Sequence, residues 1–131
     1  MFKKLFLSIL LVIAGSPSHS EVLRKSVFFE CIYAMYDALF LVEAAKNIGI
    51  KPSDETTLRF MNLTGSLMNP HLRTEPPFTD EDEVIVNRYV EENTELKSAL
   101  YEGMLIGITR KQHLIDLMIN DISDLVDGCT Q

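Results

Sequence analysis

The chain has 131 residues, 47% of them apolar, with 12 basic and 19 acidic side chains and no Trp. This composition excludes a disordered polypeptide, because the apolar fraction is high and low-complexity tracts are absent. A net charge of −7 disfavours nucleic acid and anionic membranes as partners. It suits either a basic protein partner or, more simply, the need of an exported protein to stay soluble.

Residues 1–20 have the pattern of a cleaved secretory signal peptide. Lys3 and Lys4 precede the apolar run from Leu5 to Ala14, and small polar residues lead to a cleavage site after Ser20. The run is only about half as long as a membrane span of roughly twenty residues. We therefore expect export to the bacterial periplasm, with secretion as the alternative, and no stable membrane insertion. Loss of the two lysines would make the net charge −9.

The remaining residues, 21–131, are expected to form one domain that carries the two cysteines, Cys31 and Cys129. In an oxidising compartment such a pair predicts a single disulfide. The bridge would close a loop of nearly the whole domain. Neither cysteine has the C-x-x-C spacing or the basic surroundings of a redox site.

The first predicted helix covers residues 22–47. Apolar residues recur there at steps of three and four in two adjacent stripes, which indicates a central helix. Small residues line one stripe at Cys31, Ala34 and Ala38. Gly49 is the expected stop.

Ser53 is the predicted N-cap of a second helix that ends near Met68. One face of this helix, expected to face the core, carries Leu58, Met61, Gly65 and Met68. A loop over 69–79 follows, stiffened by three prolines.

Thr79 is expected to begin the third helix, with Asp82 completing a capping box three residues later. Its apolar side is predicted to comprise Val84, Ile85, Tyr89 and Val90. Asn93 or Thr94 is predicted to cap the next helix. The apolar stripe of that helix is expected to comprise Leu96, Leu100, Met104 and Ile108, with Tyr101 and Leu105 beside them.

A polar run at 109–112 favours a break near Thr109, although one continuous helix over 94–127 is the alternative. The last stretch, with Leu114, Leu117, Met118, Ile122 and Leu125, is expected to stop at Gly128. No useful period-two pattern of a strand occurs. The fold class is therefore an all-α bundle of four or five helices with one disulfide.

Gly103 and Gly107, with Ala99 one turn earlier, form a line of small residues. We expect this line to cross the first helix closely, near Ala34 and Ala38. Homodimerisation through the same face is the alternative.

Sites for catalysis, cofactors or metals are not expected. His113 and Asp116 could share an ion on one helix face, but a metal site needs three or four ligands. Asp37 is an acid within an apolar run, with Tyr33 one turn away as its candidate partner. The alternative for Asp37 is a helix edge that faces water.

The most distinctive predicted surface joins a proline-rich loop to an acidic cluster. A stiff loop loses little entropy on binding, Arg and aromatic residues anchor interfaces, and acids steer basic partners. The predicted partner-binding residues are His71, Arg73, Phe78, Asp80, Glu81, Asp82 and Glu83. The alternative is a plain helix link followed by acids that complement the helix N-terminus.

The sequence thus favours a small exported helical protein that acts by binding another, basic protein. The concrete hypothesis is an inhibitor or immunity protein that covers the active site of a secreted toxin or hydrolase. A periplasmic stress protein or holdase, exposing apolar surface at low pH, is the alternative, and a small hydrolase ranks third.

Overall fold

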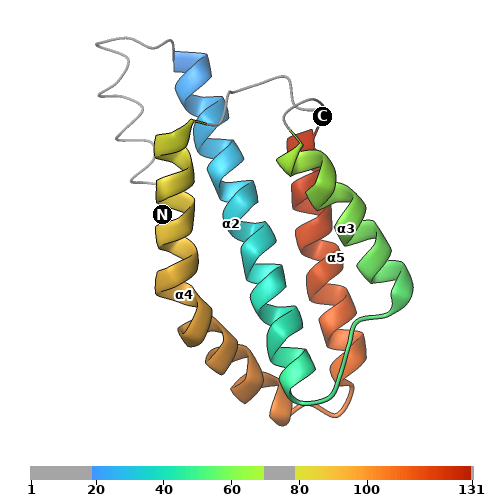
Figure 1. Cartoon of the computed structure of the whole chain (residues 1–131). Helices are drawn as coiled ribbons and strands as arrows, with labels where there is room; N and C mark the ends of the chain where they lie inside the picture. The colour runs from blue at the N-terminus through green and yellow to red at the C-terminus, as the bar shows by residue number, and fades with distance from the viewer. Residues whose placement is uncertain (1–18, 70–78, 131) are drawn as a thin grey trace.

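The computed structural model describes residues 19–69 and 79–130, and within these ranges the chain is entirely helical. The four helices are α2 (His19–Asn47), α3 (Asp54–Met68), α4 (Asp80–Ile106) and α5 (Lys111–Thr130). Successive helices run in opposite directions (Figure 1). The all-α prediction is confirmed for the part of the chain that is described.

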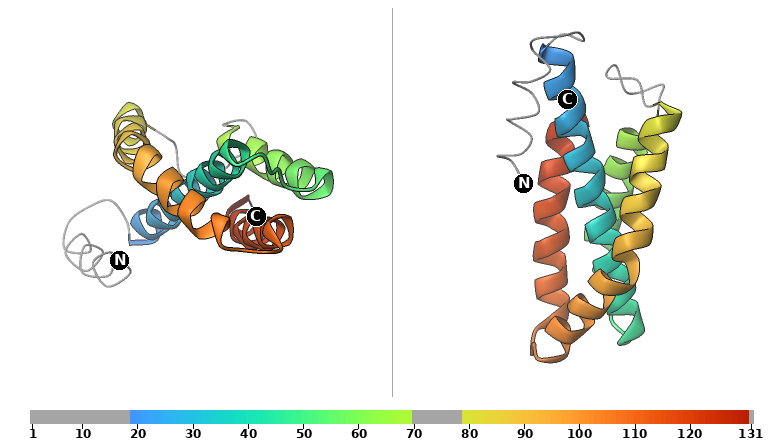
Figure 2. Two further views of the ribbon diagram at one scale, coloured as in Figure 1. Left: turned by 90° about the horizontal axis from the view of Figure 1, so that it is seen from below. Right: turned by 90° about the vertical axis from the view of Figure 1, so that its left-hand side faces the viewer.

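The helices form an open row. Helix α2 packs against α4 on one side and α5 on the other, and α3 packs mainly against α5. Figures 1 and 2 show α3 and α4 at opposite edges of the central α2–α5 pair. Each edge helix therefore has one covered side and one broad bare side.

Helix α2 supplies most of the core. The apolar positions of its two stripes meet α4 and α5, so side chains on several sides of the helix are buried. The buried apolar residues of α2 are Phe28, Cys31, Ile32, Met35, Ala38, Phe40, Leu41, Ala44 and Ala45. The prediction of a central first helix is confirmed, although the helix begins at His19 rather than at residue 22.

A disulfide between Cys31 and Cys129 ties α2 to the last turn of α5, with 6.6 Å between the two Cα atoms. The predicted pairing is confirmed. The C-terminal end of α5 lies at the end of the helical row where α4 begins (Figure 1).

Two helix boundaries follow their expected signals. Gly49 has a φ of 78°, a conformation that glycine adopts at little cost. The amide of Ile50 then donates to the Ala45 carbonyl at 2.9 Å, and that of Gly49 to Lys46 at 3.0 Å, as in a Schellman motif. Ser53 accepts a hydrogen bond from the Thr56 amide, so its predicted role as the α3 N-cap is also confirmed.

Two predicted boundaries are wrong. Helix α4 continues through Asn93 and Thr94, because their side chains donate back to the carbonyls of Tyr89 and Val90 instead of capping a new helix. Helix α5 runs past Gly128 to Thr130. The predicted break near Thr109 is confirmed, since α4 ends at Ile106 and α5 begins at Lys111.

The apolar faces of the edge helices are turned outward, contrary to prediction. On α3 the buried residues are Thr56, Phe60 and Leu67. The face expected in the core is bare, with Leu58, Met61, Gly65 and Met68 all exposed. The same reversal holds for Leu96, Leu100 and Met104 on α4. On the central helix α5, Leu117 and Leu125 are exposed, whereas Leu114, Met118 and Ile122 pack against the core as expected. An open row has too few helix neighbours to cover every apolar stripe.

The predicted glycine crossing is also wrong. Gly103 and Gly107 are exposed, and a Cβ added at either position would meet no atom within 4 Å. Helix α4 instead presents Leu105, which is fully buried, to the core. The small-residue line therefore belongs to the bare side of α4.

Residues 1–18, which hold most of the predicted signal peptide, lie outside the described residues. Among the residues that are described, none of the helices combines the length and apolar character needed to cross a membrane.

Candidate protein-binding surface

The acidic start of α4 is organised by a capping box. The Thr79 side chain accepts from the Asp82 amide, and the Asp82 carboxylate accepts from the Thr79 amide at 3.0 Å. Asp82 is 5% exposed and also pairs with Lys25 of α2 at 2.8 Å. This carboxylate therefore joins α4 to α2 as well as closing the helix end.

The pKa of Asp82 reflects two opposing effects. Burial of the carboxyl group raises its pKa, but the Lys25 ammonium and the hydrogen bonds from Thr79 outweigh burial, so the net shift is downward. The ionised form is thus held in place in the folded protein. Asp82 is therefore buried and paired within the protein, unlike the exposed acids that were predicted with it to bind a partner.

The other acids of the cluster point outward. Asp80, Glu81 and Glu83 are exposed, and so are the next two side chains, Val84 and Ile85. The expectation that Val84 and Ile85 form the buried side of the helix is therefore wrong, because Val86 takes the core position.

We call the exposed acidic side of this helix the α4 outer face. It consists of Asp80, Glu81, Glu83, Val84, Ile85, Arg88, Glu91, Glu92 and Glu95. Helix α4 as a whole carries eight acidic residues and two basic ones. Its outer face therefore combines a negative potential with two exposed apolar side chains.

The remaining residues of the predicted surface are His71, Arg73 and Phe78. All three lie outside the described residues, so their position relative to the α4 outer face is not part of the fold described above. The described part of that surface is the exposed trio of Asp80, Glu81 and Glu83.

A second polar cluster lies between α2 and α4. One carboxylate oxygen of Asp37 accepts from the Tyr89 hydroxyl at 2.7 Å and from the Lys97 ammonium at 3.0 Å. The ring of Tyr33 lies 4.3 Å from that of Tyr89, centroid to centroid. Asp37 thus has its partners across the helix interface, and the expected pairing with Tyr33 is replaced by a ring contact.

The tyrosines of this cluster are held protonated. Burial, and then the hydrogen bond and charge of Asp37, raise the pKa of Tyr89. Burial and the same carboxylate raise the pKa of Tyr101, and burial with Glu30 raises that of Tyr33. Protonated phenols beside a paired carboxylate are suited to hold two helices together. A sequence signal existed, since Tyr89, Asn93, Lys97 and Tyr101 recur at steps of four opposite Asp37.

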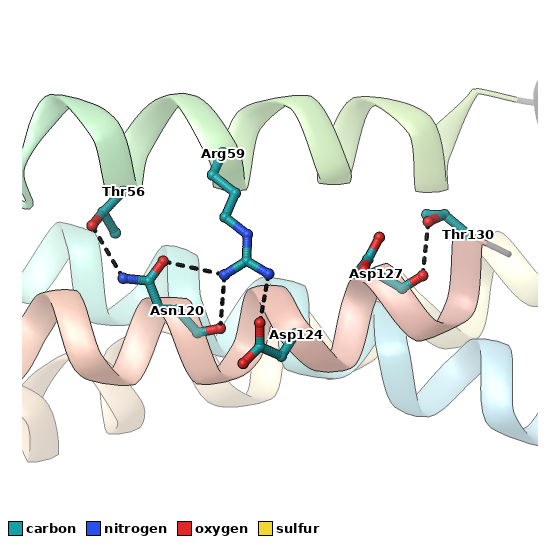
Figure 3. A network of polar contacts seen from close by, with 6 residues as sticks. All are labelled: Thr56, Arg59, Asn120, Asp124, Asp127 and Thr130. Carbon is teal, nitrogen blue, oxygen red and sulfur yellow. Dashed lines mark hydrogen bonds and ion pairs between the residues drawn. The ribbon is translucent and has the colours of Figure 1, made fainter.

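The α3–α5 interface has its own polar network (Figure 3). Arg59 of α3 donates to the backbone and side-chain oxygens of Asn120 and pairs with Asp124. The side-chain amide of Asn120 in turn donates to the Thr56 hydroxyl at 3.3 Å. These contacts fix α3 on α5 and leave its Leu58 side bare.

Asp116 is also used structurally, because it accepts from the Ser53 amide at 2.9 Å and so connects α5 to the start of α3. His113 is exposed. Across residues 19–69 and 79–130, no three His, Cys, Asp or Glu side chains are grouped as metal ligands would be.

A shallow depression of about 430 Å³ lies between the two links at the end of the row away from the disulfide. It is lined by Gly49, Ile50, Lys51, Thr109, Lys111 and Gln112. Gln112 donates to the Lys51 carbonyl and Lys111 to the Ile108 carbonyl, so polar groups of the rim hold the two links in place.

Comparison with known proteins finds no matching family model, no similar curated protein and no similar solved structure.

Proposed function

We propose that this protein is an exported binding module that recognises a basic protein through the α4 outer face. The observation that carries the proposal is the exposed concentration of Asp80, Glu81 and Glu83 beside Val84 and Ile85. Like charges gathered on one helix speed encounter with a basic partner, and adjacent apolar side chains provide contact area that slows dissociation.

The concrete form of the proposal is an inhibitor or immunity protein that covers the active site of a secreted toxin or hydrolase. A rigid helix is well suited to this task, because its backbone is already ordered and loses little entropy on binding. The capping box and the Asp82–Lys25 pair support this rigidity at the acidic end of α4. Periplasmic residence remains part of the proposal and depends on cleavage of residues 1–20.

The test begins with capture of partners by the purified protein from the periplasm of its own organism and from the products of neighbouring genes. A triple variant with Asp80→Asn, Glu81→Gln and Glu83→Gln should associate more slowly with the captured partner. The salt dependence of its association rate should also be weaker.

The matched control removes the same charge elsewhere, with Asp54→Asn, Glu55→Gln and Asp121→Asn at exposed positions on α3 and α5. The control should leave the association rate within about twofold of the parent, since its charges lie outside the proposed face. Equal effects of the two triple variants would show that only net charge matters, which contradicts a specific face.

A holdase is the second candidate, favoured by the exposed Leu58, Met61 and Met68 of α3. Exposed methionines adapt to many partners. A holdase would suppress aggregation of unrelated unfolded proteins, most strongly after acidification. Such activity, without a stoichiometric partner, would replace the inhibitor proposal.

A further inference from the structure

The second half of α4 carries a bare apolar side that is distinct from the acidic outer face. Leu96, Leu100 and Met104 follow one another at steps of four and are all exposed, Leu100 by 61%. Ala99, Gly103 and Gly107 lie beside them and are exposed as well. We call these six residues the α4 lower stripe.

The contacts of α4 explain why this stripe is uncovered. Helix α4 covers other side chains instead, among them the half-buried Tyr101, the fully buried Leu105, and Lys97, which pairs with Asp37 of α2. At the edge of the row (Figure 2), α2 is the main helix neighbour of α4 among the helices described. A large apolar side with helical spacing is typical of an interface with another helix.

The charges at the two ends of the α4 lower stripe indicate that the partner helix is α4 of a second copy. Glu91, Glu92 and Glu95 lie before the stripe, and Arg110 and Lys111 lie after it. Glu92 lies one turn before Leu96, and Arg110 lies in the link just beyond the end of α4 at Ile106, so the two charges flank the stripe at opposite ends. A second copy of the stripe placed antiparallel would therefore bring each acidic end opposite a basic end, whereas a parallel copy would oppose like charges.

The small residues fit the same arrangement. No atom lies within 4 Å of a Cβ added at Gly103 or Gly107, so a neighbouring backbone could approach closely there. Leu100 of one copy would then lie near Gly103 of the other, a large side chain opposite a small one.

We propose that the protein forms a twofold-symmetric homodimer in which the α4 lower stripes of two copies pack antiparallel. The apolar centre supplies the attraction, and the charged ends set the direction. Glu91, Glu92 and Glu95 of the α4 outer face would lie at this interface, whereas Asp80, Glu81 and Glu83 at the start of the helix stay accessible, so each copy keeps the acids that carry the proposed partner binding.

The first test is the mass of the purified, oxidised protein in solution, measured by sedimentation equilibrium over a range of concentrations. We expect a dimer with a dissociation constant in the micromolar range or tighter. Leu100→Glu should weaken dimerisation by about tenfold or more, because it places a charge at the centre of the interface.

The matched control is Leu58→Glu on α3, since Leu58 is 63% exposed and lies on the other edge of the row. It should leave the dimer intact, and far-ultraviolet circular dichroism should show that both variants are folded. A parent protein that is monomeric at every concentration would overturn the proposal. A dimer lost in the Leu58 variant but kept in the Leu100 variant would place the interface on α3 and overturn it equally.

The second test concerns direction. Glu92→Arg alone and Arg110→Glu alone should each weaken the dimer, by about threefold to tenfold, whereas the two together should restore most of the affinity. Additive losses in the double variant would exclude the antiparallel arrangement. Because these measurements use the protein by itself, their failure leaves the proposed binding of a basic partner untouched.

Discussion

Helices α2 and α4 are of similar length, 29 and 27 residues, but they use their apolar residues in opposite ways. Helix α2 buries apolar side chains on several sides, whereas α4 buries only Val86 and Leu105 and exposes most of its other large apolar residues. The difference follows from position, because α2 has a helix on each side and α4 has one on a single side. Stability should therefore be concentrated in α2, and binding in α4.

The largest expected effect on stability comes from removing the disulfide that ties α2 to α5. Replacing both Cys31 and Cys129 with Ala removes a bridge between residues 98 apart in sequence. In the chain-entropy model this costs about 4–5 kcal/mol in the free energy of unfolding. Urea denaturation measures it, and reductant should lower the parent to the level of the variant while leaving the variant unchanged. Equal urea midpoints for the oxidised parent and the variant would contradict this prediction.

The second prediction compares the two helices directly. Leu41 of α2 is fully buried, so Leu41→Ala should lower the free energy of unfolding by about 2–5 kcal/mol. The same change at the exposed Leu100 of α4 should alter it by no more than about 0.5 kcal/mol in dilute protein. Urea denaturation of the two variants side by side gives both values. Similar losses would mean that α4 carries as much of the core as α2.

Apolar spacing predicted an all-α bundle of four or five helices, of which the described residues form four. It also predicted the central place of α2, because a wide apolar stripe can be buried only between two neighbouring helices. It did not predict which sides of α3 and α4 are buried, because the spacing of apolar residues does not by itself tell which side of a helix faces the core. On α3, the side that carries Phe60 and Leu67 faces the core, and the side that carries Leu58 and Met61 does not. Thr56 is buried on the core side, where its hydroxyl accepts a hydrogen bond from Asn120.

The candidate surface was predictable only in part. The acids after Thr79 follow from helix-capping rules, and Asp82 at the third position was expected to turn back to Thr79. Its second partner, Lys25, lies far away in sequence and has no local signal. The same holds for Asp37, whose need for a partner was evident but whose actual partners, Tyr89 and Lys97, depend on the packing of α4 against α2.

The third prediction tests the acidic end of α4 through pH. Asp82 has a lowered pKa in the folded protein, so its contribution to stability is present above its ordinary value of 3.8 and is lost as the pH falls through the acid range. Asp82→Asn should cost about 1–2 kcal/mol near neutral pH and progressively less toward acid. Thermal unfolding at a series of pH values measures both trends.

Glu83→Gln is the matched control for Asp82, because Glu83 is the adjacent exposed acid. Its stability difference from the parent should stay within about 0.5 kcal/mol over the same pH range. If the Asp82 variant followed the pH dependence of the parent throughout, the carboxylate would have no special role in joining α4 to α2.

The smallest expected effect concerns the cluster that joins the middle of α4 to α2. Tyr89→Phe removes the hydroxyl that donates to Asp37, and should cost about 1 kcal/mol because Lys97 still satisfies the carboxylate. The raised pKa of Tyr89 means that its contribution is present below its ordinary value of 10.0 and is lost as the pH rises above it. The difference between parent and variant should therefore shrink in alkaline solution. In phenolate absorbance, the last tyrosine to titrate in the parent should be absent from Tyr89→Phe and should titrate earlier in Asp37→Asn. If Asp37→Asn left that titration unchanged, burial alone would protect Tyr89, and the contact between α2 and α4 would rest on packing rather than on this hydrogen bond.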